Sequence, residues 1–131
     1  MATWKQVRDY IQSNYNSAEY SEKGDFLSLV FEIDEERSQM VFVDRSKSEG
    51  GSNWIDISSA VGEVSKNDIF DLLEDLDDYV CGGAVKIDNE IWIRNRILLE
   101  SIDCPTIDNV MGIIAGIADD LEDKYVGGDS N

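Results

Sequence analysis

The fold of this chain is decided by the sequence AVKIDNEIWIR at residues 84–94 and by the apolar segment that follows it. The first part predicts a β-hairpin. A three-residue turn over Asp88, Asn89 and Glu90 would pair Ile87 with Ile91 and make one hairpin face apolar. A two-residue turn would instead set Ile87 against Glu90, and such a slip is disfavoured where one face is buried. We therefore expect the three-residue turn.

The segment after the hairpin predicts a helix from Thr106 to Tyr125, with Pro105 just before it. Its apolar residues recur at spacings of three and four and must lie on a sheet; they are Ile107, Val110, Met111, Ile114, Ile117, Leu121 and Tyr125. Gly112 and Gly116 stand on the flank of this stripe. Gly inside a helix costs about 1 kcal/mol relative to Ala, so the pair indicates close approach of a neighbour. Two explanations stay open: the glycines seat the helix on its own sheet, or they form the contact of a homodimer.

Composition favours one folded, strongly acidic domain. The chain has 131 residues, of which 28 are acidic and 11 basic, giving a formal net charge of −17. Such a surface repels nucleic acid and anionic membranes, because binding to either depends on Lys and Arg. The hydrophobic fraction of 42% is too high for a disordered acidic tail. We expect a single domain over residues 1–126 and a flexible tail over residues 127–131.

The residue types present argue against catalysis. Histidine is absent, which removes the commonest general base and the usual transition-metal ligand. No basic start followed by an apolar run opens the chain, and no apolar stretch is long enough to cross a bilayer, so we expect a cytoplasmic protein. Cys81 and Cys104 match no zinc or redox spacing, so in that reducing compartment we expect buried, reduced thiols, with a disulfide between them as the alternative. The Gly-rich stretch at residues 48–51 lacks the spacing of a phosphate-binding loop. We therefore expect no catalytic residues, no metal and no cofactor.

The first half of the chain predicts a helix followed by a three-stranded meander. Thr3 and Gln6 occupy the positions of a capping box, and the helix they begin should end near Tyr15. Alternating apolar residues then predict strands at residues 26–33, 40–43 and 54–58, with a mobile loop at residues 45–52.

An acidic helix should follow, capped by Ser65. Its predicted buried stripe consists of Ile69, Leu72, Leu73, Leu76 and Val80. Its other faces carry six acids, namely Asp68, Asp71, Glu74, Asp75, Asp77 and Asp78. A calcium loop needs its oxygens on a curled segment, whereas helical spacing splays these carboxylates outward, so we expect a solvated face.

The resulting order, helix, three strands, acidic helix, two strands and helix, has a Cys-Gly-Gly before the hairpin and Ala118-Asp119 near the end. In these features the chain resembles the YbjN-like family of bacterial proteins, which is similar in fold to class I type III secretion chaperones. The resemblance implies an α+β domain with a twisted antiparallel sheet, without catalysis, acting as a regulator or chaperone-like binder. It carries over no binding residue.

We expect a non-catalytic protein that binds an extended segment of another protein on apolar sheet surface. The outward side of the last strand offers a candidate site, with Trp92, Arg94 and Arg96 in alternation and Lys86 across from Trp92. An alternative is an immunity-type inhibitor whose acidic face covers a basic toxin or nuclease site. An enzyme of unknown reaction is the third hypothesis.

Overall fold

The computed structural model describes residues 3–126 and has an α+β architecture. Its α-helices are α1 (Trp4–Asn14), α2 (Ile69–Asp75) and α3 (Cys104–Tyr125). Its strands are β1 (Glu19–Ser21), β2 (Phe26–Glu32), β3 (Ser38–Lys47), β4 (Asn53–Gly62), β5 (Gly83–Ile87) and β6 (Glu90–Leu98). Short 3-10 turns flank α2 as η1 (Lys66–Asp68) and η2 (Leu76–Asp78), and η3 (Leu99–Ser101) precedes α3. The tail that the sequence predicts at residues 127–131 lies outside the described residues.

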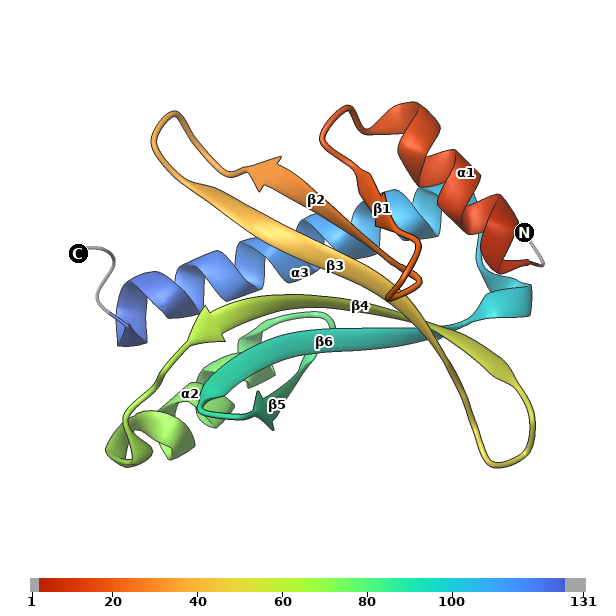
Figure 1. The fold of residues 1–131 in the computed structure, drawn as a ribbon. Helices are drawn as coiled ribbons and strands as arrows, with labels where there is room; N and C mark the ends of the chain where they lie inside the picture. The colour runs from red at the N-terminus through yellow and green to blue at the C-terminus, as the bar shows by residue number, and fades with distance from the viewer. Residues whose placement is uncertain (1–2, 127–131) are drawn as a thin grey trace.

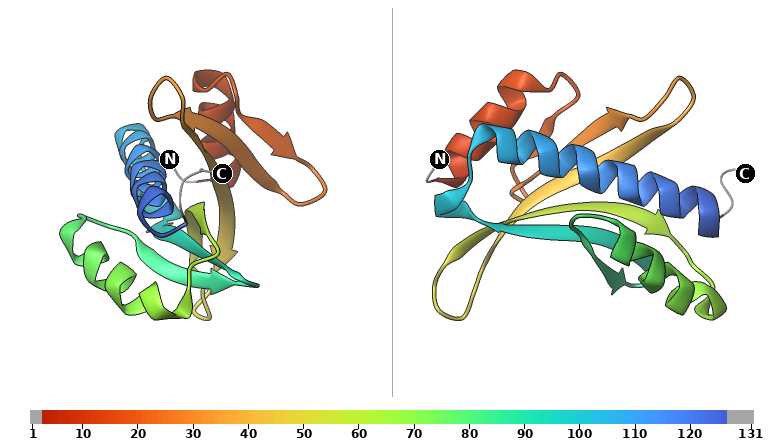
Figure 2. Two further views of the ribbon diagram at one scale, coloured as in Figure 1. Left: turned by 90° about the vertical axis from the view of Figure 1, so that its left-hand side faces the viewer. Right: turned by 180° about the vertical axis from the view of Figure 1, so that it is seen from behind.

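The strands form one antiparallel sheet in the order β1-β2-β3-β4-β6-β5 (Figure 1). The helices all lie on the same side of this sheet, with α3 running along its middle and α2 near the β5–β6 end (Figure 2). The side that faces the viewer in Figure 1 carries no helix among the described residues. We call the helix-covered side the inner face and the other side the outer face.

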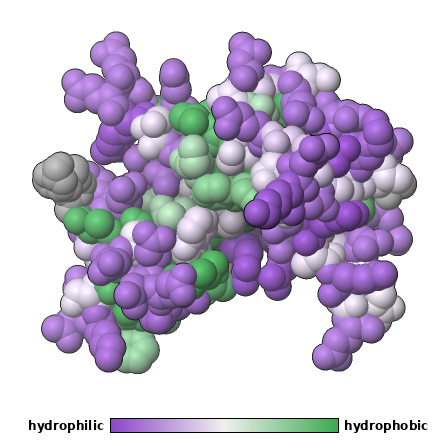
Figure 3. Space-filling model, in the orientation of Figure 1, coloured by the Kyte–Doolittle hydropathy of each residue, from purple (hydrophilic) through white to green (hydrophobic). Residues whose placement is uncertain are grey.

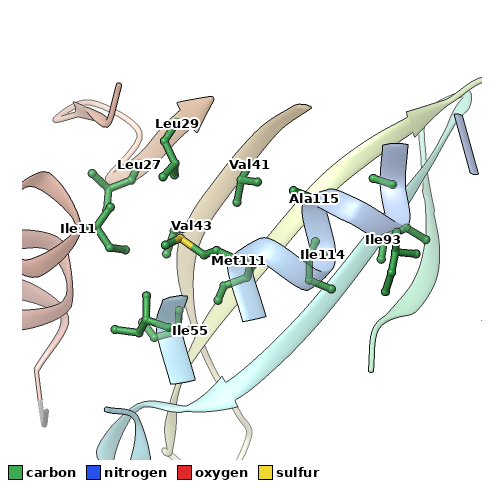
Figure 4. Packing of buried hydrophobic residues seen from close by; sticks show 14 of the residues in the cluster. Ile11, Leu27, Leu29, Val41, Val43, Ile55, Ile93, Met111, Ile114 and Ala115 are labelled. Atoms are coloured by element: carbon green, nitrogen blue, oxygen red, sulfur yellow. The ribbon is translucent and has the colours of Figure 1, made fainter. Parts of the chain in front are cut away.

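The core fills the space between the inner face and the helices. Alternate residues of β2, β3, β4 and β6 point into it, and α1 and α3 close it from the other side (Figure 4). The predicted stripe of α3 is confirmed, because Ile107, Met111, Ile114, Ile117 and Leu121 are buried. Each such side chain contributes about 1.5–3 kcal/mol when fully removed from water. Ala115 and Ala118 are buried as well, so they allow the helix to approach the sheet closely.

Strand positions follow the predictions, although two strands are longer and one was missed. β3 continues to Lys47 and β4 begins at Asn53, so the predicted loop at residues 45–52 shrinks to the turn between them. Ser46 pairs with Trp54 and Lys47 pairs with Asn53 there, so the ladder continues through mostly polar residues without a buried face. The missed strand β1 has only three residues and lies at the sheet edge beside β2. Its polar composition gives no alternation that would predict a strand.

The register predicted for the β5–β6 hairpin is wrong. Ile87 pairs with Glu90 and Lys86 pairs with Ile91, so the turn has two residues, Asp88 and Asn89. Asp88 adopts a φ of 54°, a left-handed conformation that Asp tolerates better than most residues and that tight hairpin turns use. β5 is an edge strand whose Ile87 is exposed, so burial does not enforce the apolar register.

The predicted stripe of the acidic helix is only partly correct. Ser65 caps the first turn as expected, and Leu72 is fully buried. Leu73 and Val80, however, are exposed. The segment changes from 3-10 to α and back to 3-10, so the 3.6-residue period does not hold along its whole length.

Carboxylates tie the N-terminal elements to the rest of the fold. Asp25 accepts hydrogen bonds from Trp4 Nε1 on α1 at 2.9 Å and from the Tyr20 hydroxyl on β1 at 2.6 Å. Arg45 of β3 forms an ion pair with Asp25 at 2.9 Å. Asp108 of α3 similarly accepts from the hydroxyls of Tyr10 and Tyr15. The bond to Asp108 raises the pKa of Tyr10 to about 12.

The packing predicts that adjacent leucines of α2 respond differently to the same substitution. Leu72→Asp should lower stability by more than about 2 kcal/mol, because a buried side chain is lost and a charge is buried. Ile114→Asp in α3 should do the same. Leu73→Asp, at a position 45% exposed, should change stability by less than about 0.5 kcal/mol. Thermal melts followed by circular dichroism test this, and equal effects at residues 72 and 73 would show that α2 is misplaced.

A second prediction concerns pH. The hydrogen bonds from Tyr20 and Trp4 hold the pKa of Asp25 below its ordinary value. This carboxylate therefore stabilises the fold above its unfolded pKa, and the stabilisation is lost as pH falls through the folded pKa. Asp25→Asn should lower the urea midpoint near neutral pH, and the difference from the parent chain should shrink below about pH 4.

The control for Asp25 is Asp9→Asn, which removes an exposed ion pair with Lys5 and should have little effect at any pH. A deficit in Asp25→Asn that stays constant from neutral to acidic pH would contradict the role given to the carboxylate.

Candidate functional site

The outer face of the sheet is the most distinctive surface of the described chain. Residues of adjacent strands form an apolar row across it, in which Val30 pairs with Met40, and Trp92 pairs with both Ala60 and Val85. Val30 and Met40 are exposed, Met40 to 45%. Figure 3 shows this side, where hydrophobic patches lie between hydrophilic side chains. Exposed apolar side chains that gather on one face of a sheet mark a candidate interaction site.

Three aromatic rings line a hollow in this surface. The ring centroids of Phe26 and Phe42 lie 6.1 Å apart, and those of Phe42 and Trp92 lie 5.6 Å apart. The three rings line a shallow hollow of about 250 Å³ together with Ser58, Ile87 and Arg94 and with the carboxylates of Asp44 and Asp56. A second hollow of about 360 Å³ follows at the end of the same face, lined by Trp54, Arg96 and the β3–β4 turn.

Trp92 differs from the exposed anchor that the sequence suggests. Its ring packs against Phe42 and the residue is half-buried. Its Nε1–H is buried and has no acceptor among the described residues. A buried donor without an acceptor costs about 1–3 kcal/mol. Because its ring packs against Phe42, Trp92 forms the floor of the outer face and contributes packing to the fold in spite of this cost.

The structure separates the basic residues that the sequence groups with Trp92. Lys86 lies opposite Ile91 rather than Trp92, so strand alternation places it on the other side of the sheet. Arg96 is already engaged, since its Nε donates to Asp56 at 3.0 Å. Arg94 stays half-buried in the hollow, and no carboxylate among residues 3–126 forms an ion pair with it. Within the described residues, Arg94 is thus a cation of this face that forms no ion pair.

Asp44 lines the same hollow as Arg94 and carries the opposite charge. It lies directly across from Asp56 on the neighbouring strand, and like charges in such pairs are destabilising. Burial, followed by the charges of Asp56 and Asp25, raises the pKa of Asp44. No basic side chain of the described residues forms an ion pair with it. No sequence pattern indicates this pair of carboxylates, because only the β3–β4 register brings Asp44 and Asp56 together.

The other predicted site, at Gly112 and Gly116, has no side chain or strand of the described residues packed against it. A Cβ atom built at either glycine meets no atom within 4 Å beyond its chain neighbours and the adjacent backbone of α3 itself. The explanation that the glycines seat α3 on its own sheet is therefore wrong, and Ala115 and Ala118 do this instead. The glycines lie on the solvent side of α3, where a homodimer contact stays a prediction.

Other kinds of site have little support in residues 3–126. No group of three or more Cys, Asp or Glu side chains is arranged to hold a metal ion there. No helix in this part of the chain is long and apolar enough to cross a membrane. Cys81 and Cys104 carry free, half-buried thiols, and burial raises the pKa of Cys81.

Comparison with known proteins adds no further assignment. The chain matches no protein-family model, and no curated protein shows significant similarity to it.

The open position of the glycines leads to a third prediction. Gly112→Ala and Gly116→Ala should each stabilise the monomer by about 1 kcal/mol, because Ala favours the helix and its methyl group meets nothing. Urea denaturation measures the gain. Light scattering on the parent chain and the double variant tests the homodimer: a dimer mass that falls toward the monomer's 14.7 kDa in the variant would place the contact at these glycines.

Proposed function

We propose that this chain is a non-catalytic binding domain that holds an extended apolar segment of another protein on the outer face of its sheet. The function would be chaperone-like or regulatory, as the resemblance to YbjN-like proteins implies. The observation that carries the proposal is the one-sided fold: the helices of residues 3–126 cover the inner face, while the outer face carries an apolar row, in which Val30 and Met40 are exposed, and three half-buried aromatic rings.

The chemistry of the outer face favours a particular kind of segment. Val30, Met40 and the aromatic hollow would receive apolar side chains. The Arg94 guanidinium would bind a carboxylate or a backbone carbonyl of the segment, since it has five donors and no carboxylate of its own. The acidic surface elsewhere, with a net charge of −17, would keep the complex in solution and oppose stacking of two copies of this chain.

Catalysis has no comparable support. The chain has no histidine to activate a hydroxyl or thiol, the Ser46 hydroxyl donates to Asp56, which is already bound by Arg96, and Asp44 lies in an open hollow. The free thiols of Cys81 and Cys104 support a reducing compartment, so we place the protein in the cytoplasm as part of the proposal.

The proposal predicts that outer-face substitutions remove binding without unfolding the protein. Met40→Lys together with Arg94→Ala should leave the melting temperature within a few degrees, because Met40 is exposed and Arg94 has no ion pair. Affinity for a partner isolated from the native cytosol and then purified should fall more than about tenfold, the effect of losing binding hot spots. Trp92 is a poorer target, since its truncation also removes packing with Phe42.

The control Gln12→Lys introduces the same positive charge as Met40→Lys, but at an exposed position of α1. Isothermal titration of the purified partner against the three proteins measures the difference. If Met40→Lys/Arg94→Ala and Gln12→Lys bind the partner equally well, the outer face is not the binding surface.

A further inference from the structure

The helix α2 exposes large apolar side chains in the middle of its acidic surface. Phe70 is 84% exposed and Leu73, one turn later, is 45% exposed. Val80 is 85% exposed where the chain leaves η2. Phe is among the residues most often buried, so a nearly fully exposed Phe beside an exposed Leu marks a surface rather than a failed core. Hydrophobic side chains are visible at the lower left of Figure 3, where Figure 1 places α2.

Four exposed acids surround this apolar group: Asp71, Glu74, Asp77 and Asp78. Asp71 and Glu74 each follow one of the apolar residues directly, so a stripe of carboxylates runs beside Phe70 and Leu73. None of the four forms an ion pair with a basic residue in the described part of the chain. Their charges are therefore available to a partner.

The surface is held in place from beneath. Leu72 is fully buried in the core. Asp75 forms an ion pair with Lys124 of α3 at 2.8 Å and accepts a hydrogen bond from the Tyr125 hydroxyl. The Tyr79 hydroxyl donates to Asp120, also on α3, at 3.2 Å. A helix fixed in this way needs little ordering when it binds, which improves affinity for a given contact area.

We propose that Phe70, Leu73 and the surrounding acids of α2 form a second docking surface, for a Lys- and Arg-rich face of another protein that carries an apolar socket. Charge complementarity selects this occupant. A second copy of this chain would bring four more carboxylates against the same patch, and anionic membranes and nucleic acid would be repelled in the same way. The proposal is independent of the outer-face site, because α2 lies on the helix side of the sheet (Figure 2). It gives an apolar centre to the acidic face that the inhibitor hypothesis requires.

A pair of synthetic peptides tests the surface: one alternates Leu and Lys, and the other alternates Leu and Glu. Both are titrated into the ¹⁵N-labelled full chain, and amide shifts report where they bind. The Lys peptide should shift the amides of α2, and the Glu peptide should not bind. Phe70→Ser/Leu73→Ser should weaken the Lys peptide at least about tenfold while the fold is retained, since both side chains are exposed.

Charge is tested with Asp71→Asn/Glu74→Gln against the matched control Glu35→Gln/Glu36→Gln, which removes two exposed acids from the β2–β3 turn. The first pair should weaken the Lys peptide several-fold and reduce the salt dependence more than the control. Equal losses in the two charge variants, an unchanged affinity in Phe70→Ser/Leu73→Ser, or equal binding of the Glu peptide would each overturn the proposal. So would a parent chain that is dimeric and becomes monomeric in Phe70→Ser/Leu73→Ser, because a second copy would then cover the patch.

Discussion

The fold depends on the contact between the apolar stripe of α3 and the inner face of the sheet. Met111, Ile114 and Ala118 are fully buried against strands that are far apart in sequence, so this contact joins the N-terminal meander to the C-terminal hairpin. Hydrophobic burial of this kind is the largest favourable term in folding. The remaining elements are arranged around it: α1 closes one end of the core, and α2 is fastened to α3 through Asp75.

A one-sided sheet follows from the same contact. Because the chain places its helices on the inner face only, the outer face and the solvent side of α2 are left to interact with other molecules. These two surfaces differ in chemistry. The outer face is apolar and aromatic and carries Arg94 and Asp44, which form no ion pair among the described residues, whereas the exposed side of α2 combines apolar residues with acids. We infer that the two surfaces suit different partners, one an extended apolar segment and the other a basic protein face.

Sequence reasoning predicted the elements well wherever burial enforces a period. The stripe of α3 and the meander strands have buried faces, and their residues alternate or repeat accordingly. It failed where burial is weak. The register of the edge strand β5 differs by one residue from the predicted register, because a tight turn at Asp88 sets it. The short strand β1 has no apolar pattern from which it could be predicted. The candidate site could be predicted only in part: Trp92 and Arg94 were found, while Phe26, Phe42 and Asp44 join them through strand pairing that the sequence does not display.

The central claim is that the outer face is open to solvent while the inner face is sealed. Methyl relaxation by a soluble paramagnetic compound tests it most directly, because the broadening of a methyl signal depends on how closely the compound can approach. We expect strong broadening for Val30, Met40 and Ile87, which are exposed, and little for Leu29, Val41 and Ile57, which are buried on the same strands or their neighbours. Equal protection of the two sets would show that something covers the outer face and would contradict the account.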